Sequence, residues 1–168
     1  MLANARRPAP PGASGSPERI LDRALSRLVA AGLGLGWAPI APGTAASLAA
    51  VVVCAGVRRG RLAWLAVAVT GLGWAAVRRA VPDRDADPGW VVVDEVAGQW
   101  IALLAVPPGS AAGAAAAFTV FRVLDIAKPG PVGWADRRGG AFGVMADDVV
   151  AGALAAGLIA AVRRWRRA

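Results

Sequence analysis

Apolar residues occur in runs along this chain, and short segments rich in Gly, Pro and charged residues separate the runs. A strict alternation of apolar and polar positions, which is typical of half-buried strands, does not occur in any of these runs. The lengths and spacing of the runs predict six helices, at residues 18–35, 44–57, 62–77, 90–106, 110–126 and 147–162. The pattern therefore predicts an all-α protein, a bundle of about five to six helices with polar loops between them.

The first 17 residues differ in composition from the rest of the chain. The segment MLANARRPAPPGASGSP is rich in Pro, Ala, Gly and Ser, which is typical of a disordered tail. No apolar core follows its arginines, so it lacks the pattern of a secretory signal. We therefore expect a disordered tail at residues 1–17 and a single helical domain at residues 18–168.

The apolar content is too high for a small soluble domain. Hydrophobic residues make up 57% of the chain, above the ordinary range of about 45–50%, and a domain of this size has little interior in which to bury them. Arginines cluster at the ends of the apolar runs, within a net charge of +8, which is typical of the cytoplasmic edges of membrane helices. Because no basic stripe is interleaved with aromatic residues, these charges predict an anionic lipid membrane as the partner and argue against nucleic acid.

The cysteine and histidine counts exclude several kinds of site. The chain has one cysteine, Cys54, and no histidine, so it cannot form an internal disulfide or a zinc site built from histidine or paired cysteines. Cys54 also lacks the spacing to an arginine that a cysteine-based phosphatase loop requires, and we interpret it as a buried apolar residue. Any metal must therefore be held by carboxylates, which favours a hard ion such as Mg²⁺.

Five carboxylates interrupt the apolar runs. They are Asp94, Glu95, Asp125, Asp147 and Asp148. A charge at the centre of a bilayer costs roughly 2.5–3.5 kcal/mol on insertion scales, so these groups must lie near the interface, pair with cations or bind a metal ion. If they gather around Mg²⁺, the ion would polarise a phosphoryl oxygen and help to form an attacking hydroxide.

Each group of acids also has a structural alternative. The first adjacent pair could be neutralised by arginines elsewhere in the bundle, and the last pair could cap the N-terminus of the final helix. Asp125 could form a local pair with Arg122 or Lys128, each three residues away along the chain. In the functional alternative, Arg122, Lys128 and Arg137 neutralise charge on a transferred phosphoryl group.

A Gly- and Pro-rich segment, GLGLGWAPIAPGT, precedes the second predicted helix. Thr44 and Ser47 lie at the start of that helix, where free backbone N–H groups favour phosphate binding. Simple capping by Thr44 is the structural alternative, and the local sequence favours it slightly.

Four blocks of the sequence resemble the phosphatidylglycerophosphatase A family, and they occur in the family's order. They are PIAPGTAASLAA from Pro39, VVVDEVAGQW from Val91, FRVLDIAKPGPVGWADRR from Phe121 and FGVMADDVVAG from Phe142. The resemblance covers residues 32–152, and its most specific part is FR-x-x-D-x-x-KP, followed by DR and then by DD-x-x-AG. Two loops depart from the family pattern: Ala45 and Ala46 replace a bulky residue and Gly, and RRGGAFG is shorter and lacks a basic residue.

The resemblance implies an integral membrane phosphatase of glycerophospholipid biosynthesis, which uses Mg²⁺ to hydrolyse phosphatidylglycerophosphate to phosphatidylglycerol and phosphate. We also expect a multi-pass protein of the bacterial inner membrane, with a cytoplasmic active site because the arginine-bearing loops are expected to face the cytoplasm, where the substrate headgroup is made. The acids implied in catalysis are Asp94, Glu95, Asp125, Asp136, Asp147 and Asp148, and all of them except Asp136 are expected metal ligands. The residues expected to bind substrate are Thr44, Ser47, Arg122, Lys128 and Arg137.

Two other functions remain compatible with the sequence. A non-catalytic membrane scaffold could carry the same acids if arginines neutralise them. A related phosphatase with the altered loops could act on a different phosphate ester. The sequence leaves the oligomeric state open.

Overall fold

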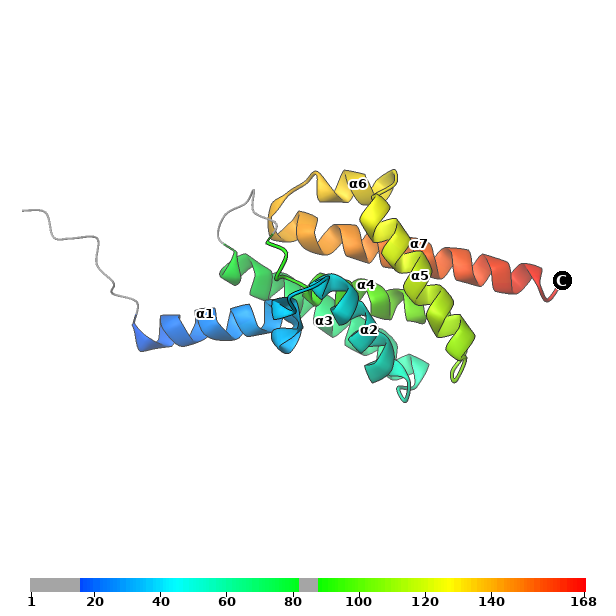
Figure 1. The fold of residues 1–168 in the computed structure, drawn as a ribbon, viewed down its shortest axis with the longest axis horizontal. Coiled ribbons are helices and arrows are strands. Elements are labelled where there is room, and N and C mark those ends of the chain that lie inside the picture. Colours follow the sequence, from blue (N-terminus) through cyan, green and yellow to red (C-terminus); the bar gives the residue numbers. More distant parts are fainter. Residues whose placement is uncertain (1–15, 82–87) are drawn as a thin grey trace, which may run out of the picture.

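The computed structural model describes residues 16–81 and 88–168, which form helices connected by short turns (Figure 1). These residues contain seven α-helices, one 3-10 helix and no strand. In chain order the elements are α1 (Pro17–Ala30), η1 (Gly32–Trp37), α2 (Pro42–Cys54), α3 (Arg59–Ala80), α4 (Val93–Leu103), α5 (Ala111–Ala127), α6 (Pro131–Asp136) and α7 (Gly140–Trp165). The predicted all-α class is confirmed.

All six predicted helices are present, with shifted ends. The last of them, α7, begins at Gly140 rather than at residue 147. Two short elements were not predicted. The first, η1, starts within the last four residues of the first predicted helix, and its Gly34 has a positive φ of 106°. The second, α6, lies in a predicted loop and begins at Pro131, because the fixed φ of proline suits a first helical position. The predicted tail at residues 1–17 lies outside the described residues except for its last two, and Pro17 is the first residue of α1.

Helix α4 lies at the centre of the bundle and contacts α2, α3, α5 and α7 (Figure 1). Most of its 11 residues are buried. The indole Nε1 of Trp100 donates a hydrogen bond to the Ala50 carbonyl oxygen at 3.1 Å, which connects α4 to α2. Because α4 starts with the residues VDE, its central position carries two carboxylates into the interior of the protein.

Helices α4 and α7 cross with their backbones in contact. A Cβ on Gly98 would lie 2.5 Å from the Asp148 carbonyl oxygen, and a Cβ on Gly152 would lie 2.9 Å from the Gly98 Cα. The residues that precede these glycines, Ala97 and Ala151, are fully buried. Small residues permit such close approach, which is a common way to pack helices inside membranes.

Of the helices described, α3 and α7 are each long and apolar enough to cross a membrane. Large apolar side chains on them are exposed, including Trp64 and Leu72 on α3 and Leu158 on α7. Exposed apolar surface of this kind marks membrane or protein contacts. The length of these helices and their exposed side chains are both consistent with association of the bundle with a membrane.

Candidate active site

The glycine contact between α4 and α7 brings two acidic pairs together. Asp94 lies one helical turn before Gly98, and Asp148 lies one turn before Gly152. Carboxylate oxygens of Asp94, Glu95 and Asp148 all lie within 4.8 Å of one another. The point at which the two helices cross therefore sets the distance between their acids.

Helix α5 adds a third source of carboxylate. Oxygens of Asp125, Asp147 and Asp148 also lie within 4.8 Å of one another, so Asp148 belongs to both groups of three. The acids line a small cleft of about 130 Å³. The residues that line it are Gly89, Val91, Asp94, Glu95, Asp125, Lys128, Val144, Asp147 and Asp148.

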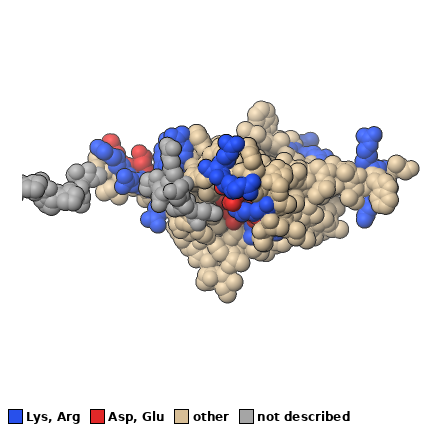
Figure 2. Space-filling model, turned by 90° about the horizontal axis from the view of Figure 1, so that it is seen from above, with Lys and Arg blue, Asp and Glu red and all other residues tan. Residues whose placement is uncertain are grey.

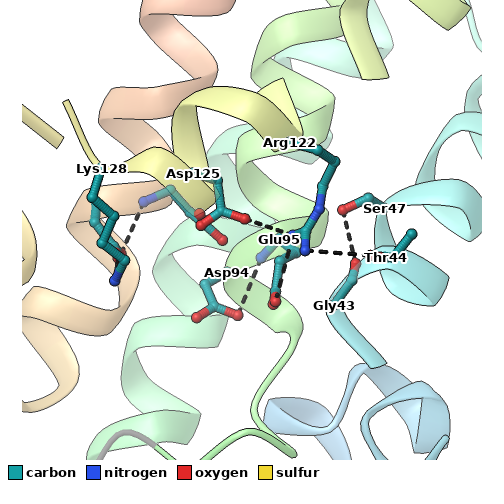
Figure 3. Close-up of polar contacts among 10 residues, drawn as sticks. Gly43, Thr44, Ser47, Asp94, Glu95, Arg122, Asp125 and Lys128 are labelled. Carbon is teal, nitrogen blue, oxygen red and sulfur yellow. Dashed lines mark hydrogen bonds and ion pairs between the residues drawn. The ribbon is translucent and has the colours of Figure 1, made fainter. Parts of the chain in front are cut away.

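Arg122 connects three helices on one side of the acids. Its Nη1 donates to Asp125 Oδ2 at 2.6 Å and lies 3.8 Å from Glu95 Oε1. Its Nη2 donates to the hydroxyl of Thr44 in α2 at 3.4 Å. Figure 3 shows Arg122 between the acids and α2, with Lys128 on the opposite side of the acids.

Lys128 lies just beyond the end of α5, in a left-handed conformation with φ 46° and ψ 49°. This conformation is uncommon for a residue with a side chain, and it ends the helix here. The Lys128 Nζ donates to Asp147 Oδ2 at 2.9 Å and also to Asp136 Oδ1. Burial lowers the pKa of Lys128, but these two carboxylates outweigh burial and raise it above its ordinary value, so the amine stays protonated.

The cluster holds more negative than positive charge. Asp94 and Asp148 are only 7% and 3% exposed, and neither forms a salt bridge with any lysine or arginine of the described residues. Burial, followed by the charge of Glu95, raises the pKa of Asp94 well above its ordinary value. Within the same part of the chain, Glu95 Oε2 and Asp148 Oδ1 are buried and have no hydrogen-bond partner.

Figure 2 shows acidic and basic side chains together on one face of the molecule. Acidic atoms are visible near the middle of one face of the molecule, and basic side chains lie directly beside them. An opening lined with acids and bordered by cations suits a ligand that brings both a metal ion and an anionic group.

This geometry excludes one structural alternative for the acids and confirms another. Asp147 and Asp148 do not cap the last helix, because that helix begins seven residues earlier, at Gly140. Asp125 does form the local pair with Arg122, whereas Lys128 contacts Asp147 and Asp136 instead. Arginine therefore neutralises only part of the cluster.

The start of α2 also differs from the predicted capping arrangement. The helix begins at Pro42, so Thr44 lies inside its first turn, and the cap position is occupied by Ala41 in a left-handed conformation. Thr44 is partly buried and contacts Arg122. The hydroxyl of Ser47 is fully buried and donates to the Gly43 carbonyl oxygen at 2.9 Å (Figure 3), so it supports the first turn of α2.

Asp136 and Arg137 lie at the edge of the cluster. Asp136 is partly exposed, and among the described residues it is connected to the other acids through Lys128, which contacts both Asp136 and Asp147. Arg137 is exposed in the turn that follows α6, and neither residue lines the cleft. Their predicted roles in catalysis and substrate binding stay predictions.

Four residues that shape the site were not identified from the sequence. A Cβ on Gly43 would collide with the Glu95 carboxylate, and Gly98 and Gly152 form the contact between α4 and α7. Gln99 is fully buried one turn beyond Glu95, and neither polar atom of its amide has a hydrogen-bond partner in the described chain. The signal for two of these glycines is that each acidic pair is followed by Ala-Gly, as DEVAG and DDVVAG.

The chain is similar in sequence to named bacterial proteins. It is 39% identical over 139 residues to phosphatidylglycerophosphatase A of Escherichia coli (strain K12), which covers 79% of this chain and 80% of that protein. It is 34% identical over 144 residues to the Haemophilus influenzae protein of the same name, which covers 82% of this chain and 88% of that protein. It is also 40% identical over 148 residues to a Bacteroides thetaiotaomicron protein named provisionally as a phosphatidylinositol-3-phosphatase. That alignment covers 82% of this chain and 92% of the relative.

No solved structure shows significant similarity to the chain. The sequence model of one family, described as phosphatidylglycerophosphatase A, matches residues 28–163. This match includes every acid of the cleft together with Arg122 and Lys128. The chain therefore belongs to the phosphatidylglycerophosphatase A family of phosphatase enzymes.

Proposed function

We propose that this protein hydrolyses the phosphate monoester of phosphatidylglycerophosphate in a Mg²⁺-dependent reaction of glycerophospholipid biosynthesis. The products are phosphatidylglycerol and phosphate. The observation that carries the proposal is a cluster of five carboxylates from three helices in one buried cleft, in a member of a phosphatase family. The choice of substrate is supported by the names of the Escherichia coli and Haemophilus influenzae relatives, which are phosphatidylglycerophosphatases.

The donors of the cleft fit Mg²⁺. The ion prefers oxygen ligands and is usually held by one or two carboxylates together with water and phosphate oxygens. Buried carboxylate oxygens without a partner, as on Glu95 and Asp148, are costly unless a positive group lies beside them. The ligands would come from Asp94, Glu95, Asp125, Asp147 and Asp148. When bound, Mg²⁺ would polarise a phosphoryl oxygen and lower the pKa of a water molecule.

The two cations on either side of the acids would bind the phosphate group. Arg122 is held in place by Asp125 and Thr44, and its Nε–H is buried without a partner in the described chain, so it retains a donor for an anionic oxygen. Lys128 is part-buried at the edge of the cleft and stays charged. Fixed positive groups of this kind stabilise the negative charge that develops in phosphoryl transfer. A neighbouring carboxylate would accept the proton of the attacking water.

The proposal places the enzyme in the bacterial inner membrane as a multi-pass protein, with its cleft on the cytoplasmic side where phospholipid headgroups are assembled. Support comes from α3 and α7, which are long enough to cross the bilayer. An Arg138→Cys variant would report the side, because Arg138 is exposed beside the cleft-bearing end of α7. The native Cys54 should react little with a maleimide, because burial raises the pKa of its thiol to about 11 and the thiolate is the reactive form. Labelling of intact cells by an impermeant maleimide would contradict the proposed orientation.

The decisive assay is phosphate release from phosphatidylglycerophosphate by the purified protein in detergent micelles, with Mg²⁺ and with a chelator. Asp94→Asn is the test variant, and Asp22→Asn, an exposed acid on α1, is the matched control. We expect metal-dependent release in the wild type and in the control, and almost none in Asp94→Asn. Absence of release from a folded wild-type protein, with all lipids tried, would support the non-catalytic scaffold instead.

A second substrate class is favoured by one specific observation. The Bacteroides thetaiotaomicron relative is as similar to the chain as the other relatives are, but its name assigns a phosphoinositide as substrate. The same assay should therefore include phosphatidylinositol 3-phosphate and a water-soluble glycerophosphate. A higher kcat/KM for one of these compounds would identify the enzyme as a phosphatase of a different ester.

A further inference from the structure

A large apolar groove lies between α2 and α5, separate from the acidic cleft. Its volume is about 580 Å³, within the range of about 300–1,000 Å³ that is typical of ligand sites. Its walls include Leu48 and Val52 of α2, Ala111 and Phe118 of α5, and Leu103 of α4. In Figure 1, α2 and α5 lie side by side along the same part of the bundle. None of the residues proposed for catalysis or phosphate binding lines this groove.

On both α2 and α5, the groove begins one helical turn from a residue that borders the acids. On α2, Leu48 is one helical turn beyond Thr44, the residue that contacts Arg122. On α5, Phe118 is one turn before Arg122 itself. Residues four apart lie on the same face of a helix. The polar end of this face therefore meets the acids, and its apolar end forms the groove.

The chemistry of the walls indicates an apolar occupant. Arg59 is the one charged residue among those that line the groove, and its guanidinium donates a hydrogen bond to the Leu104 carbonyl oxygen. The remaining lining offers little that could bind a headgroup or a peptide backbone. Val52 is 73% exposed and lies on this wall. The groove is thus open at its side and suited to a flexible hydrocarbon chain.

We propose that the groove binds one acyl chain of the phospholipid whose phosphate is held in the acidic cleft. This inference rests on the function proposed above. A phospholipid joins a phosphate ester to a long hydrocarbon chain, and the α2–α5 face offers a polar site and an apolar site in that same order. The groove would align the lipid so that its headgroup reaches the carboxylates, and binding of the chain would lower KM for long-chain substrates.

Two pairs of neighbouring residues provide matched variants. Ala115 and Ala116 are both exposed on α5, but only Ala115 lines the groove. Val52 and Val53 are both exposed on α2, and only Val52 lines it. Replacement by Trp at the first member of each pair would fill the groove. Replacement at the second member adds the same bulk to the same helix outside it.

The kinetic test compares a long-chain phosphatidylglycerophosphate with a short-chain analogue. We expect Ala115→Trp to raise KM for the long-chain substrate about tenfold or more, which is the effect of displacing roughly two methylene groups from an apolar site. The short-chain KM should not change, and Ala116→Trp should leave both values unchanged. Equal effects of the two variants, or equal effects on both substrates, would overturn the proposal.

A binding measurement separates this proposal from the proposed activity. A phospholipid with a diazirine in its acyl chain should label peptides of α2 and α5 in the wild type, as mass spectrometry would show. Labelling should fall in Val52→Trp and persist in Val53→Trp. Labelling confined to α3 and α7 would overturn the acyl-chain site even if the enzyme is active. Loss of all phosphatase activity with normal groove labelling would instead count against the proposed reaction alone.

Discussion

The acidic cleft and the apolar groove share two helices, α4 and α5, yet they hold opposite kinds of side chain. Helix α5 contributes Asp125 to the cleft, where Arg122 contacts it, and contributes Ala111 and Phe118 to the groove. Helix α4 begins with Asp94 and Glu95 and ends with buried Leu103. The buried acids thus lie toward one end of α4 and α5, and the apolar lining lies toward the other end. In α4 and α5, the proposed catalytic and acyl-binding residues are therefore separated along the length of the same helix.

The largest expected effect comes from removing the one charge that both groups of acids share. Asp148→Asn keeps the shape of the side chain and should lower kcat about 10²–10³-fold, the usual size of losing one electrostatic contact to the transition state. The loss should be the same for long-chain and short-chain substrates, because Asp148 lies in the cleft and not in the groove. Phosphate release with the two substrates measures this. A loss restricted to the long-chain substrate would break the division between the two regions.

A smaller effect is expected from a methyl group at the contact between α4 and α7. Gly152→Ala places a Cβ against the backbone of Gly98 and should destabilise the protein by about 1–3 kcal/mol, as overpacking usually does. Gly157→Ala, in the same helix but with open space around it, should be neutral or stabilising by about 0.5–1 kcal/mol. Thermal unfolding in detergent micelles measures both. Equal stability of the two variants would show that the glycine contact does not set the positions of the acids.

Replacing Lys128 should have a moderate effect confined to the cleft. Lys128→Met removes the amine that contacts Asp136 and Asp147 and should cost about 1 kcal/mol of stability, because the side chain is one-third exposed and water screens the pair. It should also lower kcat about tenfold by removing positive charge near the phosphate. Lys128→Arg keeps the charge and should retain most of this activity in the phosphate-release assay. A change in the long-chain KM alone would contradict this assignment.

The smallest expected effect is at Gln99, between the two regions. Its amide is buried without a partner in the described chain, so Gln99→Leu should raise stability by about 1 kcal/mol by removing an unpaired polar group. Thermal unfolding would show the gain, and Gln99→Glu, which buries a charge, should show a loss. If Gln99→Leu is instead less stable and less active, the amide has a ligand, and the polar region extends one turn deeper than the cleft described here.

Local patterns in the sequence predict much of this molecule. The six helices follow from apolar runs bounded by Gly, Pro and arginine, because a run longer than about 10 residues with helical spacing has few other ways to bury its apolar side chains. The five acids were identified because a carboxylate within an apolar run is costly. The local pair of Arg122 with Asp125 also follows from their spacing of three residues.

Contacts between distant segments required the structure. Spacing along the chain slightly favoured Thr44 as a helix cap and left capping by the last acidic pair as an alternative. Both were wrong because the helix starts lie upstream, at Pro42 and Gly140. The pairing of Lys128 with Asp147 depends on the left-handed turn after α5. Element boundaries of this kind are set by tertiary packing, which outweighs local preference.

By itself the sequence determined that the chain is helical, rich in membrane-compatible surface, and supplied with acids and cations in a family-specific order. Only the tertiary structure decided that Asp148 is shared by two groups of carboxylates and that an apolar groove lies between α2 and α5. The physical reason is the contact between Gly98 and Gly152, where two backbones meet without side chains between them. Helical periodicity fixes which residues share a face, but the point where two faces meet depends on packing across the whole bundle.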